Sequence, residues 1–196
     1  MADNYLERKM EEYRNRPVST CRPHIPLERL MLRNRSHRGY DPQFIVRDDQ
    51  LRRIIDEHTR IASARNQQVL RFRPVTQTEA GKVLTCIRLG AALPQLHLPI
   101  PGSEPNAFII CCSTVPEDRF VDIDLGIAVQ SMLLQAVEIG LNGICIAAFD
   151  RQQLRDQFAL PCEPLLVLAV GRGTEKIELV DIDADGIAIR VRVMRR

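Results

Sequence analysis

The second half of the chain contains short runs in which apolar residues are hardly interrupted by polar ones. Three of them have the length of a strand: residues 107–113 (AFIICCS), 143–148 (GICIAA) and 165–170 (LLVLAV). Side chains alternate between the two faces of a strand, so a run without polar alternation is buried on both faces. The pattern therefore predicts a central sheet that is covered by helices on both sides.

A helical repeat of apolar positions separates the first two of these runs. Asp124 is the expected N-cap of this helix, which closes at Gly140, and its breadth of apolar positions is typical of a core helix. Those positions are Leu125, Ala128, Val129, Met132, Leu133, Ala136 and Val137. A shorter helix is expected after Asp150, where Phe149 and Leu154 occupy the two positions of a hydrophobic staple.

The first third of the chain is expected to be helical with one extended interruption. Residues 4–15 predict an amphipathic helix, and the prolines in residues 16–26 predict an extended arm, so we separate an arm (1–26) from a domain (27–196). A short helix is expected at 26–31. A further helix is expected to begin at Asp48, its N-cap, because apolar positions then recur at helical spacing. Those positions are Leu51, Ile54, Ile55, His58 and Ile61.

Strand-like patterns and one long loop complete the prediction. Residues 69–73 and 83–88 are expected to be strands, and the four prolines in residues 90–106 favour an irregular binding loop. A turn at 183–186 and a strand at 187–193, with one face in water, are expected near the C-terminus.

Charge is unevenly distributed along the chain. Residues 1–73 hold 16 Lys and Arg against 10 Asp and Glu, whereas residues 74–196 hold 11 against 15, which gives formal charges of +6 and −4. Nucleic acid is one possible partner for the basic part. However, the chain has no Trp and only three Tyr for stacking on bases, so a compact phosphate fits better.

Several classes of protein are not supported by any pattern in the sequence. The six cysteines form no CxxC pair and most lie in apolar runs, so we expect buried, reduced thiols. No uninterrupted apolar run approaches the length of a membrane span, and the charged start differs from a signal peptide, which predicts a cytoplasmic protein. Nucleotide-binding and hydrolase motifs and metal-ligand spacings are missing from the sequence. His58 is interpreted as a core residue. Without evident catalytic side chains, a bound cofactor is expected to perform the chemistry.

Three stretches have the residue types that suit such a cofactor. NRSHRGY (residues 34–40) carries two arginines around a serine, which fits a phosphate but also a solvated basic turn. SARNQQ (63–68) offers donors and acceptors for a flavin, although polar helix ends look similar. GRGTEK (171–176) follows a buried strand, where cofactors often bind in layered proteins, and a plain surface turn is the alternative.

Taken in order, these stretches resemble the nitroreductase family, the homodimeric FMN-dependent NAD(P)H oxidoreductases, and especially its short single-domain members. The resemblance runs through NYLERKMEEY, NRSHRGYD, IASARNQQVLRF, FVDIDLGIAVQSMLLQAVEIGLNGICIAAFD and PLLVLAVGRGTEKIEL. It implies an α+β fold, which is an α/β three-layer sandwich with a mostly antiparallel sheet between helices, in an intertwined homodimer.

The resemblance also implies a set of flavin-binding residues. Arg35, Ser36 and Arg38 match the family's phosphate-binding cluster, and Arg172 and Lys176 match its late basic residues. Ser63, Ala64, Asn66 and Gln68 match a segment that binds the flavin of the partner subunit. Backbone groups of Cys145, Ile146 and Ala147 are expected to face the flavin ring near its N5 atom. No metal is expected.

These observations predict an FMN-dependent enzyme. It passes electrons from NAD(P)H to a nitroaromatic, quinone or flavin acceptor by a ping-pong mechanism, with flavin N5 as the reacting atom. Two alternatives remain open at this stage. One is a module that binds nucleic acid or another polyanion through its arginine-rich first third, and the other is a protein that binds FMN without turnover.

Overall fold

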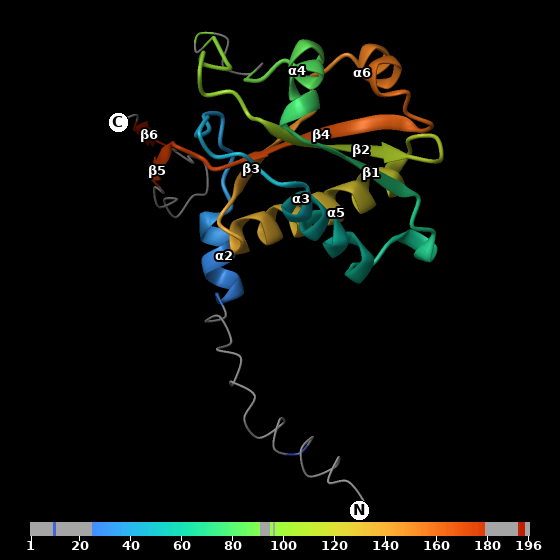
Figure 1. The fold of residues 1–196 in the computed structure, drawn as a ribbon. Coiled ribbons are helices and arrows are strands. Elements are labelled where there is room, and N and C mark those ends of the chain that lie inside the picture. The colour runs from blue at the N-terminus through green and yellow to red at the C-terminus, as the bar shows by residue number, and fades with distance from the viewer. Residues whose placement is uncertain (1–9, 11–24, 91–94, 96, 179–191, 195–196) are drawn as a thin grey trace, which may run out of the picture.

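The computed structural model describes residues 10, 25–90, 95, 97–178 and 192–194 (Figure 1). The helix expected at 4–15, most of the arm at 16–26, and the late turn and most of the strand at 183–193 lie outside these residues. The described part of the 90–106 loop is irregular, in agreement with its prolines.

A four-stranded antiparallel sheet forms the centre of the molecule, as predicted. Its strand order is β1-β2-β4-β3, so β2 and β4 are central and β1 and β3 are the edges. The strands are β1 (Leu70–Val75), β2 (Ala107–Ser113), β3 (Asn142–Ile146) and β4 (Glu163–Gly171). The three continuously apolar runs of the sequence thus become the three adjacent strands β2, β4 and β3.

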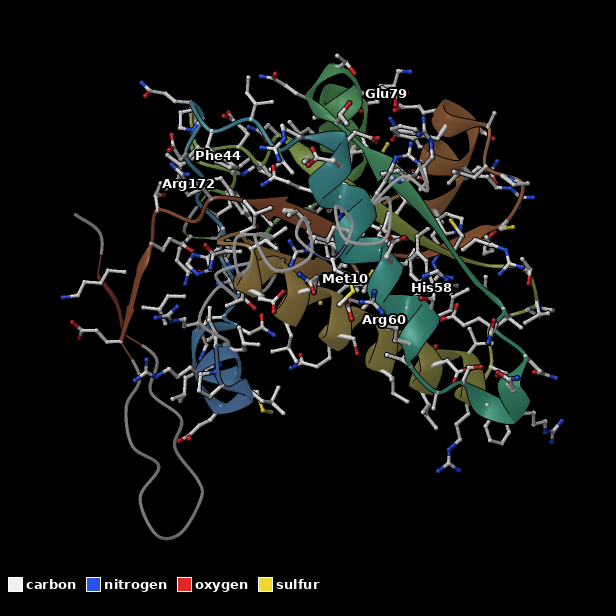
Figure 2. All side chains as sticks on the ribbon, turned by 60° about the horizontal axis from the view of Figure 1, so that its bottom comes forward. Met10, Phe44, His58, Arg60, Glu79 and Arg172 are labelled. Atoms are coloured by element: carbon white, nitrogen blue, oxygen red, sulfur yellow. The ribbon has the colours of Figure 1, made fainter. Side chains whose placement is uncertain are left out.

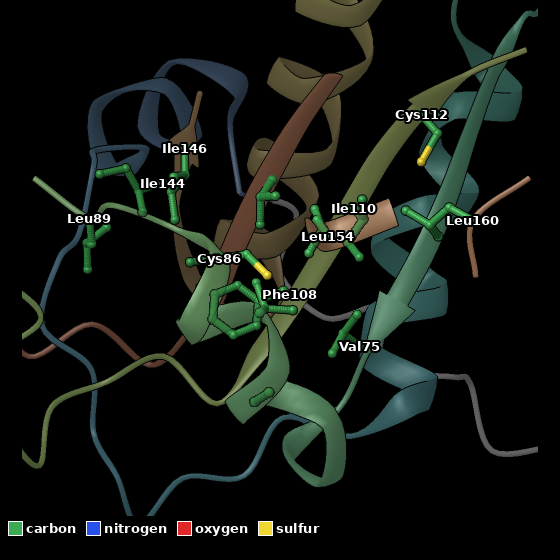
Figure 3. Packing of buried hydrophobic residues seen from close by; sticks show 14 of the residues in the cluster. Val75, Cys86, Leu89, Phe108, Ile110, Cys112, Ile144, Ile146, Leu154 and Leu160 are labelled. Carbon is green, nitrogen blue, oxygen red and sulfur yellow. The ribbon is translucent and has the colours of Figure 1, made fainter. Parts of the chain in front are cut away.

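Helices cover both faces of this sheet and make three layers (Figure 1). The helices on one face are α4 (Gln77–Cys86) and α6 (Arg151–Phe158), and those on the other are α3 (Asp48–Asp56) and α5 (Arg119–Glu138). Along β2, Phe108 and Ile110 pack toward α4 and α6 (Figure 3), while Ile109 and Cys111 pack toward α3 and α5. All four are fully buried, which confirms the three-layer α+β fold.

Smaller elements surround the sandwich. α2 (Leu27–Arg33) confirms the expected short helix, and two 3₁₀ turns, η1 (Glu57–Arg60) and η2 (Ala64–Asn66), lead into β1. A separate hairpin consists of β5 (Lys176–Glu178) and β6 (Arg192–Met194). The α6 helix begins as expected, because the Asp150 carboxylate accepts from the Gln153 amide at 2.9 Å.

The free edge of β1 is protected by its own side chains. Pro74 has no amide hydrogen to offer, which an edge strand tolerates. The Arg71 guanidinium donates to the carbonyl oxygens of Gln68 and Leu70 at 2.8 and 2.7 Å. Charged side chains and proline on an edge discourage the pairing of further strands.

The strand expected at 83–88 is wrong, because these residues end helix α4. Ala80, Val83 and Cys86 are buried at intervals of three residues on one side of that helix. They pack against the apolar face of the sheet (Figure 3). The run VLTCI looks like a strand only when the polar first turn of the helix is left out of the window.

Two expected helix starts are also corrected. Arg47, rather than Asp48, is the N-cap of α3, and the Gln50 side chain accepts from its amide at 3.1 Å. The N-cap of α5 is Asp118, whose carboxylate accepts from the Phe120 and Val121 amides at 2.8 and 2.9 Å. Asp124 instead lies inside α5 and is buried.

Helix α5 is long and apolar, but it does not contradict the prediction about membrane spans, because Asp122 and Asp124 interrupt its apolar run. By length and composition α5 is apolar enough to cross a bilayer, and it is the one such helix among the described residues. This is weak evidence for a span, because α5 packs against the sheet through Met132 and Ala136, which are fully buried. Only 44% of its most apolar window is buried, however, so one face of α5 remains apolar and exposed.

The prediction for the cysteines is confirmed for three of the five that are described. Cys86, Cys111 and Cys112 are buried, and all five described cysteines are free thiols. Burial raises the pKa of the Cys112 thiol to about 12 and that of Cys111 well above its usual range, so both stay protonated. Cys145 is exposed and Cys162 is half-buried, contrary to expectation; Cys145 lies on the edge strand β3, whose outer side is bridged only at Gly143 among the described residues.

Close packing between β3 and α5 leads to a first prediction. A Cβ atom on Gly143 would lie 2.7 Å from Leu133 Cδ2 and 2.8 Å from the carbonyl oxygen of Ala169. We expect Gly143→Ala to lower the free energy of unfolding by roughly 1–3 kcal/mol, because the backbone of β4 cannot move away cheaply. Urea denaturation measures the change.

Gly81→Ala is the matched control. Gly81 is exposed in the middle of α4 and has no atom within 4 Å of the added Cβ. It should stabilise the fold by roughly 0.5–1 kcal/mol, because alanine loses less backbone entropy in a helix. Equal effects of the two substitutions would contradict the packing described here.

Candidate functional site

Two segments that are far apart in the sequence, 35–41 and 171–176, pair beside the end of β4. The Asp41 amide donates to the Arg172 carbonyl at 2.8 Å, and the Thr174 amide donates to the Gly39 carbonyl at 3.1 Å. The Arg38 amide donates to Glu175 Oε2 at 2.7 Å. The NRSHRGY and GRGTEK stretches are therefore neighbours in space.

Glycines allow this close approach. A Cβ on Gly171 would lie 2.6 Å from Cδ1 of the Tyr40 ring, and one on Gly173 would lie 2.2 Å from Nδ1 of the His37 ring. Tyr40 is almost fully buried, and its hydroxyl donates to the His37 carbonyl at 2.8 Å. The two glycines of GRGTEK thus make room for the rings of NRSHRGY.

The 35–41 segment also continues the sheet beyond β3. Ser36 forms a parallel bridge with Gly143, and the His37 amide donates to the Gly143 carbonyl at 3.2 Å. From the other side, the Asn142 side chain accepts from the Gly173 amide at 3.1 Å. The segment around Ser36, which we predict to bind the phosphate, therefore lies alongside β3. The end of β3 carries Cys145, Ile146 and Ala147, which we predict to face the flavin ring.

Those three residues differ in their exposure. Ile146 is buried in the core under α4 and α6, whereas Cys145 and Ala147 are exposed. A hollow of about 490 Å³ opens at the end of β3 and is lined by Ala147, Ala148 and Arg88, among others. Backbone groups at the end of β3 therefore lie beside this hollow.

The predicted arginines point to different places. Successive side chains of an extended segment point to opposite sides, and Arg35 and His37 both line a hollow of about 380 Å³ next to the end of α5. The Arg35 guanidinium donates to the carbonyls of Met31 and Asn34 at 2.8 and 2.7 Å, and so satisfies the C-terminal end of α2. Arg38 is half-buried, and its Nε is buried without a hydrogen-bond partner among the described residues.

The late basic residues are exposed and have local partners. The Arg172 guanidinium carbon lies 4.0 Å from the centroid of the Phe44 ring (Figure 2), and its Nη1 is 3.9 Å from Asp41 Oδ2. Lys176 Nζ is 3.5 Å from Glu178 Oε1. The structure thus brings Gly39 and Asp41 next to the 171–176 backbone and the Arg38 amide onto the Glu175 carboxylate. It does not gather the four predicted basic side chains at one point.

His37 and Glu175 form a buried polar pair beneath this surface. His37 Nδ1 is 3.8 Å from Glu175 Oε2, and the imidazole is only 7% exposed. Burial lowers the pKa of His37, the Glu175 charge opposes that change, and Arg38 adds to it. His37 is therefore neutral near pH 7. Sequence reasoning missed Glu175 because it considered only the basic residues of GRGTEK.

The second part of the predicted site is the 63–68 segment before β1. Arg65, Asn66 and Gln68 have φ values of 52°, 54° and 48°, in the left-handed region. The side chains of Asn66 and Gln68 are exposed, and Gln68 Nε2 donates to Asn66 Oδ1 at 3.0 Å. Inside, the Ala64 amide donates to both carboxylate oxygens of the buried Asp124 at 2.9 and 3.0 Å.

His58 lies next to this segment and has the structural role that the sequence predicted. Its ring packs against the Phe72 ring at a centroid distance of 4.8 Å with the two planes tilted by 58°, and its Nδ1 is 2.7 Å from the Ile55 carbonyl oxygen. The role of Asp124 was not predicted. A capping motif is a local pattern, whereas the amide that Asp124 binds is 60 residues away.

The two parts of the site lie at opposite edges of the sheet. Residues 63–68 lead into β1 at one edge, and residues 35–38 run beside β3 at the other, with β2 and β4 between them. One chain therefore cannot bring both parts onto a single small ligand.

The residues of each part fit FMN in their chemistry. The unpartnered Arg38 Nε and the exposed Ser36 hydroxyl suit a phosphate, because a charge-assisted hydrogen bond would satisfy the buried donor. The exposed amides of Asn66 and Gln68 offer both donors and acceptors, as ribityl hydroxyls and a flavin edge require.

The neutral, buried His37 leads to a second prediction. Its pKa in the folded state lies below the unfolded value near 6.5, so the unfolded chain binds more protons as the pH falls. The free energy of unfolding should therefore fall between about pH 7.5 and about pH 5.5. It should fall less in His37→Gln. Urea unfolding at several pH values measures both slopes, and identical slopes would contradict the burial effect.

Comparisons with known proteins place the fold among solved structures. Residues 106–172 match the sequence model of the Nitroreductase family. No curated protein matches the chain. A nitroreductase family protein from Streptococcus pneumoniae TIGR4 superimposes with a TM-score of 0.67 at 15% identity, over 84% of this chain and 100% of that one.

Two further solved structures share the fold. A protein from Exiguobacterium sibiricum 255-15, solved in complex with FMN, has a TM-score of 0.65 at 16% identity, over 85% of this chain and 98% of that one. An FMN-dependent nitroreductase from Clostridium difficile R20291 has a TM-score of 0.61 at 18% identity, over 80% and 92%. The chain therefore has the nitroreductase fold, and its residues 106–172, from β2 to the end of β4, carry the sequence pattern of the nitroreductase family.

Proposed function

We propose that this protein is an FMN-dependent oxidoreductase that passes electrons from NAD(P)H to a nitroaromatic, quinone or flavin acceptor. The observation that carries the proposal is the pairing of segments 35–41 and 171–176 beside β3, together with the Arg38 Nε, which is a buried donor without a partner among the described residues. The match to the Nitroreductase family supports an oxidoreductase, and a relative of the same fold was solved with FMN.

The chain's own residues have distinct roles in this proposal. Ser36 and Arg38 hold the phosphate, and Arg35, Arg172 and Lys176 add positive charge around it. Backbone groups of Cys145, Ile146 and Ala147 lie against the ring. From the partner subunit, the same chain contributes Ser63, Ala64, Asn66 and Gln68.

The bound cofactor performs the chemistry, and the protein orients it. When bound, FMN would supply a hydride acceptor at N5, and the Arg38 guanidinium would add positive charge to the site by electrostatic stabilisation. Donor and acceptor occupy the same position in turn, so the kinetics should be ping-pong. No acidic or basic side chain of this chain is required as a proton donor in the proposal.

A homodimer would complete the site, and α5 offers the surface for it. Phe120, Ile123 and Ile127 are 52%, 48% and 41% exposed, and they line one face of α5 at helical spacing. Leu27 and Met31 of α2 are 59% and 51% exposed. The two helices are linked by a hydrogen bond from Asn34 Nδ2 to Gln130 Oε1, at 3.3 Å.

Burial against a second chain would account for the apolar residues that α5 exposes. A helix with so many apolar residues is normally buried all round, yet Phe120, Ile123 and Ile127 are exposed in the described part of the chain. A symmetric dimer brings the same face of both chains together. Such a contact can carry the 63–68 segment of one chain toward the β3 edge of the other.

Two alternatives remain for the site. A protein that binds FMN without turnover would show the same cofactor spectrum but no steady oxidation of NAD(P)H. A polyanion-binding module would lose its ligand steeply as the salt concentration rises, whereas an enclosed FMN would survive moderate salt.

The proposal predicts a yellow protein. As purified, or after addition of FMN, it should absorb near 450 nm, roughly as any oxidised flavin does, and bleach under NAD(P)H without air. Steady oxidation of NAD(P)H with menadione as acceptor separates an enzyme from a binding protein. A protein that stays colourless after incubation with FMN would rule the proposal out.

Arg38→Ala tests the phosphate contact. A charge-assisted hydrogen bond contributes about 1.5–3 kcal/mol, so the Kd for FMN should rise roughly 10- to 100-fold, as measured by quenching of flavin fluorescence. Arg155→Ala is the control, because Arg155 is an exposed arginine of α6 that pairs with Glu163 at 3.2 Å. Unchanged affinity in Arg38→Ala would remove Arg38 from the site.

Ile123→Asp tests the dimer. The substitution places a charge on the exposed face of α5, so we expect a monomer by analytical ultracentrifugation and at least about a tenfold loss of FMN affinity. Ile45→Asp is the matched control, because Ile45 is 52% exposed outside both α2 and α5. A dimeric Ile123→Asp protein would place the subunit contact elsewhere.

A further inference from the structure

We propose that Asp124 is a positioning residue that holds the 63–68 loop in the conformation needed to reach the partner's flavin. This inference rests on the proposed function, since it concerns the same site. Asp124 does not touch the ligand itself in this proposal. It acts through its contact with the Ala64 amide.

Asp124 is in an unusual environment for a carboxylate. It is 5% exposed, it lies inside α5 well beyond the Asp118 cap, and both of its oxygens accept from one amide, at 2.9 and 3.0 Å. A buried carboxylate loses its hydration and needs hydrogen bonds in return. An apolar residue at this position of the helix would be buried without this loss of hydration.

The loop on the other side of this contact is strained. Arg65, Asn66 and Gln68 all have positive φ, and for residues other than glycine each such conformation costs on the order of 1–2 kcal/mol. Strain of this kind is concentrated at functional sites and persists only where neighbouring groups enforce it. Short bonds within the loop help, since Ser63 Oγ accepts from the Gln68 amide at 3.2 Å and the Ser63 carbonyl accepts from the Asn66 amide at 3.0 Å.

The contact with Asp124 ties this strained loop to a rigid element. Asp124 lines two hollows beside this contact, one of about 20 Å³ shared with Ser63 and His58 and one of about 380 Å³ shared with Ala64 and Arg65. Its neighbour Ile123 lies on the exposed apolar face of α5. The same helix turn therefore fixes both the loop and the surface proposed to meet the second chain, which sets where Asn66 and Gln68 arrive.

The experiment measures the loop directly and then the ligand. Asp124→Asn keeps the shape and one acceptor but removes the charge, and Asp124→Ala removes the acceptor. Asp122→Asn is the matched control, because Asp122 is an exposed carboxylate of the same helix. Hydrogen exchange of peptides covering 63–69, in the FMN-free protein, should be about 10-fold faster in Asp124→Asn and about 100-fold faster in Asp124→Ala.

Affinity for FMN should follow the same order. We expect the Kd to rise about 3- to 10-fold in Asp124→Asn and more in Asp124→Ala, while both proteins remain dimeric and keep unchanged exchange in β2 and β4. Trypsin should also cut after the exposed Arg65 faster in these variants than in the control. A general loss of stability would instead speed exchange in the central strands.

A double-mutant cycle isolates the contact. Ala64→Pro removes the amide hydrogen, and proline fits here because Ser63 is extended and Ala64 begins a 3₁₀ turn. If the bond carries the effect, adding Asp124→Ala to Ala64→Pro should change the exchange of 66–69 less than twofold. Independent, multiplying effects would overturn the inference.

The outcomes separate this inference from the proposed function. If the wild-type protein does not bind FMN, the proposed function fails, and the exchange measurement still decides whether Asp124 holds the loop. If the wild-type protein binds FMN and the Asp124 variants bind it equally well with unchanged exchange at 63–69, the positioning role fails and the proposed function stands.

Discussion

Burial of β2 and β4 on both faces is the constraint on which the rest of the structure depends. Phe108 and Ile109 are both fully buried although they point to opposite faces, so helices must cover the sheet on both sides. Once both faces are covered, a ligand can approach only at an edge or at the ends of the strands. The segments with ligand-type residues, 35–41 and 63–68, lie at the two edges.

The same constraint accounts for the exposed face of α5. One side of the helix is used to cover the sheet, where Met132 and Ala136 are fully buried. The opposite side carries Phe120, Ile123 and Ile127, which the described residues of the same chain leave exposed. The separation of the site at two edges and the uncovered face of α5 are independent observations, and a second copy of the chain would resolve both.

The elements that the sequence predicted correctly are those whose pattern is complete within a short window. Residues 107–113 form β2 because a continuous apolar run of strand length can be buried on both faces of a covered sheet. The run at 83–88 misled because its helical periodicity becomes visible only with Ala80 included. The exposure of Cys145 was not predictable, because a strand's position at the edge of a sheet depends on topology and not on its own residues.

The candidate site shows the same division. Its segments were identifiable from their residue types, but the residues they bind were not. Asp124 accepts from the Ala64 amide, 60 residues away in the sequence, and the Arg38 amide donates to Glu175, 137 residues away. Arg35 and Arg38 look equivalent in the sequence, but the Arg35 guanidinium donates to carbonyl oxygens at the end of α2, whereas the Arg38 backbone amide donates to Glu175 Oε2.

The contact that Glu175 makes with Arg38 leaves the Arg38 guanidinium available to an anion. The Glu175 carboxylate accepts from the Arg38 backbone amide, so the charge is used to fix the backbone and not to neutralise the guanidinium. The Arg38 Nε is left buried without a partner among the described residues, which is a costly state for a cationic donor. Arg35, whose donors already reach two carbonyls, has no such deficit. An anion bound beside Ser36 would give the Arg38 Nε a hydrogen-bond acceptor, which Arg35 does not lack. The stability of a bound phosphate would therefore depend on Arg38 more than on the number of arginines nearby.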